Sequence, residues 1–169
     1  MGSVIMLSGP VGAGKTTVAR ELIARLPEPL SYIEGDTFWS FIAKAEKRSR
    51  IENFPVIMRA MTAAALPFAR SGFDVLIDFS IPPEFLATAR KILKEVALDY
   101  VVLRPSLAAC EARAAGRSEG KIADYAAYRE FYLLFDAAEH YTIRDEGADA
   151  AALAARIREG LSAGRFRVS

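Results

Sequence analysis

The stretch Gly9–Thr17, GPVGAGKTT, places glycines and one lysine at a spacing that can bind phosphate. Gly9, Gly14, Lys15 and Thr16 match the pattern G-x-x-x-x-G-K-[ST], in which glycines let backbone N–H groups point at phosphate oxygens. The lysine of such a loop reaches the β- and γ-phosphates of a nucleoside triphosphate, and the hydroxyl coordinates Mg²⁺. The alternative is a glycine-rich turn that only joins two elements. The stretch therefore predicts a nucleotide site.

The backbone of this stretch is expected to hold most of the nucleotide phosphates. Successive N–H groups and the N-terminus of the following helix would supply partial positive charge. The residues expected to bind the nucleotide here are Gly9, Gly12, Ala13, Gly14, Lys15, Thr16 and Thr17. Lys15 is also expected to be catalytic, because its charge can stabilise the transferring phosphoryl group.

Two aspartates follow apolar runs that are typical of strands. Asp78 ends Val75–Ile77, and ligands of open α/β sheets bind at the carboxyl ends of the strands. Asp78 can there hold Mg²⁺ together with Thr16, or orient an acceptor, and its alternative is a loop or capping role. Asp36 ends an earlier strand, so parallel topology would bring it to the same edge. Its alternative is the N-cap of a helix that begins at Thr37.

Apolar runs with β-branched residues alternate with longer helical patterns along the chain. This alternation predicts an α/β fold, a parallel sheet with helices on both of its faces. The expected strands lie at about 3–8, 30–35, 73–80, 98–105 and 140–145. The expected helices include one that ends before Pro27, one from Thr37, one at about 54–70 and one at about 106–117.

Composition limits the class of protein. The 169 residues fit one domain, and 52% hydrophobic with 25% charged residues is typical of a globular chain. A net charge of +1 argues against a nucleic-acid partner. Cys110 is the only cysteine, which excludes an internal disulfide and favours a reducing compartment for the protein. The position of Cys110 in a predicted helix favours a packing role for its side chain. With no signal-like or membrane-spanning apolar run, we expect a cytoplasmic protein without membrane contact.

Four motifs together resemble the small P-loop kinases. GPVGAGKTT is highly specific, whereas YIEGD, DVLID and EARAAGR are short, and they follow in this order. The group includes adenylate kinase, shikimate kinase, gluconate kinase and chloramphenicol phosphotransferase. The resemblance covers nearly the whole chain and implies one three-layer domain over 1–169, with a five-stranded parallel sheet in the order 2-3-1-4-5. It also implies an acceptor-binding flap at about 37–70 and a short helical lid at about 113–128.

The resemblance also implies roles for single residues. In these kinases an aspartate at the position of Asp36 binds the acceptor hydroxyl and takes its proton, so Asp36 is expected as the base, with Asp78 as the alternative. Arg113 and Arg117 lie four positions apart on one helix face and resemble the paired lid arginines of adenylate kinase-like enzymes. Arg113 would stack on adenine and Arg117 would neutralise the transferring phosphoryl group. A surface pair is the alternative.

The preferred hypothesis is a kinase that uses ATP and Mg²⁺ to phosphorylate a hydroxyl of a small metabolite or antibiotic-like acceptor. The chain lacks the glycine triplet of shikimate kinases and the Gly-Phe-Pro-Arg element of adenylate kinases, which argues against both activities. The alternatives are a regulatory P-loop NTPase switch that acts on a protein partner, and a nucleoside or polynucleotide 5′-kinase. Either a monomer or a homodimer is compatible with these hypotheses.

Side chains of the predicted flap bear on the acceptor. Phe38, Trp39 and Phe41 suggest an aromatic wall that suits a ring-bearing acceptor, with a place in the core as the alternative. Three flap arginines could bind an acidic acceptor or lie in solvent: Arg48, Arg50 and Arg59.

Overall fold

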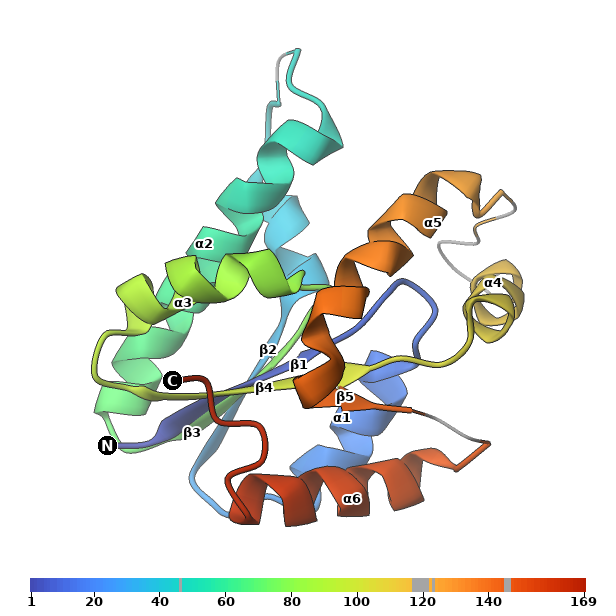
Figure 1. Cartoon of the computed structure of the whole chain (residues 1–169). Coiled ribbons are helices and arrows are strands. Elements are labelled where there is room, and N and C mark those ends of the chain that lie inside the picture. Colours follow the sequence, from blue (N-terminus) through green and yellow to red (C-terminus); the bar gives the residue numbers. More distant parts are fainter. Residues whose placement is uncertain (46, 117–121, 123, 145–146) are drawn as a thin grey trace.

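A parallel five-stranded sheet forms the centre of the protein, which we describe from a computed structural model (Figure 1). The structure describes residues 1–45, 47–116, 122, 124–144 and 147–169. Within these residues the strand order is β2-β3-β1-β4-β5, and each neighbouring pair is parallel. The α/β fold and the order 2-3-1-4-5 are therefore confirmed.

The elements have the following bounds. The strands are β1 (Ser3–Ser8), β2 (Leu30–Glu34), β3 (Asp74–Asp78), β4 (Ala97–Leu103) and β5 (Thr142–Ile143). The α-helices are α1 (Lys15–Ile23), α2 (Arg50–Arg70), α3 (Leu86–Leu93), α4 (Leu107–Ala115), α5 (Ala126–Leu133) and α6 (Ala150–Ser162). The 3₁₀ helices are η1 (Gly35–Phe41), η2 (Pro83–Phe85) and η3 (Leu134–Tyr141).

The sheet is covered on both faces, because successive side chains of a strand point to opposite sides. In the central strand β1, Val4 and Met6 pack in one core cluster with α2 and α3. Ile5 and Leu7 pack in a second cluster with α1 and α6. Figure 1 shows these two helix pairs on opposite sides of the sheet. The apolar, non-alternating sequence of β1 is thus the consequence of burial on both faces.

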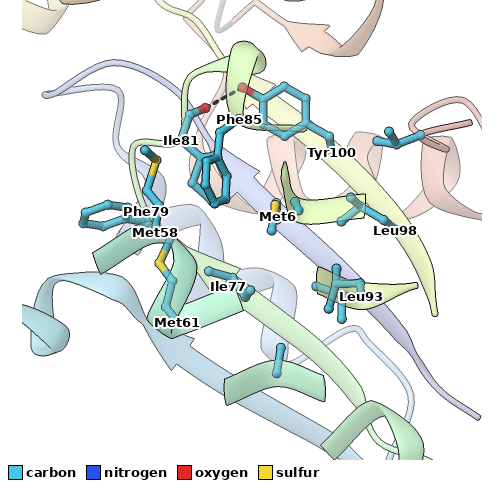
Figure 2. Close-up of a cluster of buried hydrophobic side chains, with 14 of the residues drawn as sticks. Met6, Met58, Met61, Ile77, Phe79, Ile81, Phe85, Leu93, Leu98 and Tyr100 are labelled. Carbon is cyan, nitrogen blue, oxygen red and sulfur yellow. Dashed lines mark hydrogen bonds between the residues drawn. The ribbon is translucent and has the colours of Figure 1, made fainter. Parts of the chain in front are cut away.

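Figure 2 shows part of the core cluster that lies between the sheet and α2 and α3. Its labelled side chains are Met6, Met58, Met61, Ile77, Phe79, Ile81, Phe85, Leu93, Leu98 and Tyr100. Full burial of a side chain of this kind stabilises the fold by about 1.5–3 kcal/mol. The Tyr100 hydroxyl donates to the Ile81 carbonyl at 2.6 Å, and the Ser8 hydroxyl donates to the same carbonyl at 2.7 Å. The segment that follows β3 is therefore held firmly at the edge of the sheet.

Two helices begin differently from the sequence prediction. Helix α2 begins at Arg50 rather than near Phe54, because Ser49 and Glu52 form a capping box in which each side chain binds the other residue's backbone N–H. The segment after Asp36 is a 3₁₀ helix, η1, which already begins at Gly35.

Helix α1 ends at Ile23, before Pro27 as predicted, and turns follow it. Helix α4 ends at Ala115, and part of the predicted lid, residues 117–121 and 123 with Arg117 among them, lies outside the described residues. The bounds of the flap and of the lid stay predictions.

Cys110 packs as the sequence predicted. It is fully buried in a small cluster with Ala114, Tyr125 and Tyr132, which joins α4 to α5. Phe135 of η3 is fully buried, and Phe131 of α5 packs against the main core. Among the described helices, none is both long and apolar enough to span a membrane.

Candidate active site

The loop between β1 and α1 contains backbone conformations that only glycine adopts readily. Gly9, Gly12 and Gly14 have φ angles of 140°, 83° and 87°. A Cβ atom at Gly9 would overlap the Leu103 carbonyl, and one at Gly12 would overlap the Cys110 carbonyl. The loop is therefore wrapped closely between β4 and α4. No described side chain caps the N-terminus of α1, and such a helix end attracts anions through its partial positive charge.

Lys15, the first residue of α1, folds back over this loop. Its Nζ donates to the Ser80 hydroxyl at 2.8 Å, to the Pro10 carbonyl at 3.1 Å and to the Gly9 carbonyl at 3.2 Å. Sequence reasoning missed Ser80, although it comes only two residues after Asp78 at the same edge of the sheet. The ammonium group thus lies where the loop and the end of β3 meet.

Thr16 and Asp78 meet as predicted. The Thr16 hydroxyl donates to Asp78 Oδ2 at 2.7 Å, across 62 sequence positions. The Tyr32 hydroxyl donates to the same oxygen at 3.3 Å. Tyr32 was also missed, because a tyrosine within a strand carries no local sign of a role in a site. Burial raises the pKa of Tyr32, followed by the nearby charge of Asp78, so its hydroxyl remains a donor.

Asp78 is only 4% exposed. Burial raises the pKa of Asp78, and the charge of Lys15 and the hydrogen bonds from Thr16 and Tyr32 offset this in part. Asp36 raises the pKa further, as the smallest of these causes. The charged form of this carboxylate therefore lowers the stability of the folded protein, as is expected of a group that binds a ligand.

Asp78→Asn should stabilise the nucleotide-free protein at neutral pH. The amide oxygen can still accept from Thr16 and Tyr32, while the buried charge disappears. Because the folded protein holds the Asp78 proton more tightly than the unfolded chain, the parent loses stability as pH rises from the ordinary pKa of about 4 through the raised pKa. We expect a melting temperature about 2–4 °C above the parent at pH 7 for each kcal/mol gained.

Circular dichroism melts from pH 3 to 8, in a chelator, measure this difference. It should vanish at the acidic end, where Asp78 is neutral in both states. Added Mg²⁺ and ADP should stabilise the parent more than the variant. A parent that is more stable than the variant at pH 7 in chelator would contradict the argument.

Thr16 and Asp78 fit a magnesium ion. Mg²⁺ prefers hard oxygen ligands and keeps several waters, so it is usually held by one or two protein groups and by substrate phosphates. A hydroxyl and a carboxylate oxygen 2.7 Å apart supply that donor set. They lie beside Gly9–Thr17, which we call the phosphate-type loop. No group of three or more histidine, cysteine or acidic side chains suited to a metal occurs in the described part of the chain. The site is thus unlike a zinc site, which uses a dense set of protein ligands.

Asp36 lies in η1, directly after the carboxyl end of β2, and its side chain is exposed. The N-cap position of η1 is Glu34, and no described side chain caps this helix, so the capping alternative for Asp36 is not supported. Since strands β2, β3 and β1 are neighbours and parallel, Asp36, Asp78 and the phosphate-type loop occupy the same edge of the sheet.

Arg113 reaches the loop from α4. Its Nη1 donates to the Ala13 carbonyl at 3.4 Å. The side chain therefore lies beside the predicted nucleotide rather than on a remote surface. Arg117, predicted as its partner, lies outside the described residues, so the pairing of the two arginines stays a prediction.

The aromatic residues of η1 divide between core and surface. Phe38 and Trp39 are half-buried and pack against the main core, whereas Phe41 is 74% exposed. Trp39 stacks on Phe54 of α2 with ring centroids 6.4 Å apart. The guanidinium of Arg50 lies 4.1 Å from the Trp39 ring centroid. The core alternative thus holds for Phe38 and Trp39, and the aromatic wall for an acceptor stays a prediction.

Phe54 continues this aromatic contact across the sheet edge. Its ring lies 5.5 Å from Phe79, which follows β3, and 5.9 Å from Phe131 of α5. Of the other predicted flap arginines, Arg48 donates to the Glu52 carbonyl at 3.2 Å, and Arg59 is exposed on α2. Arg50 is therefore the flap arginine that the structure joins to the aromatic residues.

Comparison with known families gives one match. The sequence model of AAA_33, described as an AAA domain, matches residues 4–131 of the 169, which is more than half of the chain. No curated protein matches the chain.

Solved structures of similar fold cover nearly the whole chain. The tunicamycin resistance protein of Deinococcus radiodurans is 18% identical, with a TM-score of 0.73 and coverage of 100% of this chain and 99% of that one. The APS kinase of Mycobacterium tuberculosis in complex with AMPPNP and APS is 20% identical, with a TM-score of 0.67 and coverage of 95% and 98%. The shikimate kinase of Acinetobacter baumannii in complex with shikimate is 22% identical, with a TM-score of 0.63 and coverage of 97% and 95%. These likenesses show a shared fold.

Proposed function

Because the chain belongs to the AAA_33 family of AAA domains, within the superfamily of small P-loop kinases, we propose that it is an ATP-dependent kinase that phosphorylates a hydroxyl of a small molecule. The observation that carries this proposal is the contact of Thr16 with Asp78 beside a glycine loop that Lys15 folds over. These groups suit a nucleoside triphosphate with its metal ion. Asp36 at the same sheet edge adds a group that can take a proton.

In the proposed reaction the acceptor oxygen attacks the γ-phosphorus of ATP. The bond to the bridging oxygen breaks, ADP leaves, and Asp36 takes the proton of the acceptor hydroxyl. Lys15 stabilises charge on the phosphates, and backbone N–H groups of Gly9–Thr17 hold them in place. Arg113 stacks on the adenine, and Arg117 neutralises the transferring group. Thr16 and Asp78 would hold Mg²⁺, which would supply positive charge to the phosphates.

The residues of η1 and α2 support a class of acceptor. Trp39 comes three positions after Asp36, and residues at this spacing lie on the same side of a 3₁₀ helix. Arg50, which stacks on Trp39, offers a fixed guanidinium to an anion. We therefore infer an acceptor with a ring or an apolar part and a negatively charged group.

A screen of hydroxyl compounds tests the proposed function. The protein is incubated with MgATP and a metabolite and antibiotic library, and products are detected by the mass of one added phosphoryl group. We expect product among ring-bearing, acidic alcohols with the parent, formed at least about 10²-fold more slowly with Asp36→Asn. Product from neutral open-chain polyols would contradict the inferred class of acceptor but would support the proposed kinase activity. ATP hydrolysis without any phosphorylated product, stimulated by a protein partner, would favour a regulatory switch instead.

A further inference from the structure

Tyr125 contacts the phosphate-type loop from a distant part of the chain. It is 6% exposed, precedes α5, and its hydroxyl donates to the Val11 carbonyl at 2.5 Å across 114 sequence positions. Val11 is the residue of the loop that packs in the small cluster with Cys110, Ala114, Tyr125 and Tyr132. This hydrogen bond was not expected from the sequence, in which Tyr125 lies within the predicted lid.

The Val11–Gly12 peptide is oriented by this bond. In a trans peptide the C=O and the following N–H point in opposite directions. With the Val11 carbonyl directed at Tyr125, the Gly12 N–H points away from α4 and α5. No hydrogen bond joins that N–H to another of the described residues. The group is buried with the rest of Gly12, and a buried N–H of this kind is expected to find a partner.

Because of the glycine, the Val11–Gly12 peptide does not keep this orientation by itself. Gly12 has φ 83°, and a glycine adopts positive and negative φ almost equally well, so the peptide before it can turn over cheaply. Turned over, it would present a carbonyl oxygen where an N–H is needed, and that oxygen would repel a phosphate. The hydrogen bond from the Tyr125 hydroxyl to the Val11 carbonyl opposes this rotation of the peptide.

We propose that Tyr125 is a positioning residue for nucleotide phosphate: its hydroxyl holds the Val11–Gly12 peptide so that the Gly12 N–H binds a phosphate oxygen. The inference rests on the proposed nucleotide site. Neighbouring contacts support it, because the Cys110 backbone lies against Gly12 and Arg113 donates to the Ala13 carbonyl. Residues of α4 and the residue before α5 thus contact three successive residues of the loop, Val11, Gly12 and Ala13.

Tyr125→Phe tests the proposal, with Tyr132→Phe as a matched control. The Tyr132 hydroxyl also donates to a backbone carbonyl from the same cluster, at 2.8 Å, but to Pro105, outside the loop. We expect Tyr125→Phe to bind ADP about fivefold more weakly in calorimetry, the factor of one neutral hydrogen bond. Tyr132→Phe should remain within about twofold of the parent. Loss of one such bond leaves a domain folded.

The amide resonance of Gly12 gives a second readout, which a merely structural role would not move. ADP should shift this resonance strongly in the parent and in Tyr132→Phe, and less in Tyr125→Phe. Equal ADP affinity and an equal Gly12 shift in Tyr125→Phe and the parent would overturn the proposal, as would equal losses in both variants. A parent that binds no ADP would instead overturn the proposed function.

Discussion

Asp36→Asn is expected to reduce phosphoryl transfer by about 10²–10⁴-fold, the usual contribution of a general base, while ADP affinity stays as in the parent. Asp36 lies in η1, outside the loop that is expected to hold the phosphates. An amide keeps the size and hydrogen-bonding reach of the carboxylate but cannot take a proton. The substitution therefore separates binding from chemistry, which steady-state turnover with the acceptor from the screen and calorimetry with ADP measure in parallel.

Ser40→Ala is the control for this substitution. Ser40 lies in the same 3₁₀ helix, and its hydroxyl donates only to the exposed Thr37 carbonyl at 2.7 Å. The control should retain turnover, so that a loss in Asp36→Asn is not a consequence of damage to η1. If Asp36→Asn keeps its turnover, Asp36 is not the base, and Asp78 becomes the carboxylate to test.

Lys15→Ala is expected to weaken ATP and ADP binding by about 10–100-fold, the worth of a charge-assisted hydrogen bond, and to abolish transfer. The ammonium group contacts two carbonyls of the loop and Ser80, so it is already placed beside the expected phosphates. Its removal takes away a positive charge that the loop and the end of β3 hold in place. It also removes an attraction that holds down the pKa of Asp78.

Calorimetry with ADP and Mg²⁺ measures the effect of Lys15→Ala. Lys91→Ala is the matched control, since Lys91 is an exposed lysine of α3, which packs on the other face of the sheet from α1. It should bind ADP like the parent. Parent-like affinity in Lys15→Ala would mean that the loop does not hold nucleotide phosphate through this residue.

The sequence by itself determined the parts of the fold and the site whose signals are local. The glycine loop and Lys15 follow from one contiguous stretch, since the backbone conformation there depends on glycine and not on distant contacts. The strands follow from apolar runs, because burial on both faces leaves only apolar residues in the middle of β1, at Val4–Leu7, and of β3, at Val75–Ile77. The order of the strands came from the resemblance to P-loop kinases rather than from any pattern in the runs themselves.

The sequence also contains a local signal for the start of α2 that the prediction from apolar residues did not use. The residues Ser49 and Glu52 form the capping box that starts α2, yet the apolar pattern alone placed the start near Phe54. A cap acts through backbone N–H groups, so it can begin a helix before the apolar face does.

Only the tertiary structure decided which side chains complete the site. Tyr32 and Tyr125 lie in a strand and at a helix start where the neighbouring residues indicate no role, and Ser80 follows Asp78 without a motif of its own. Each reaches the loop or Asp78 across 46 to 114 sequence positions. Such contacts depend on which strands are neighbours and on how α4 and α5 pack against the loop, and those are properties of the whole fold. The local sequence therefore specified where phosphate can bind, and the packing of distant segments decided what surrounds it.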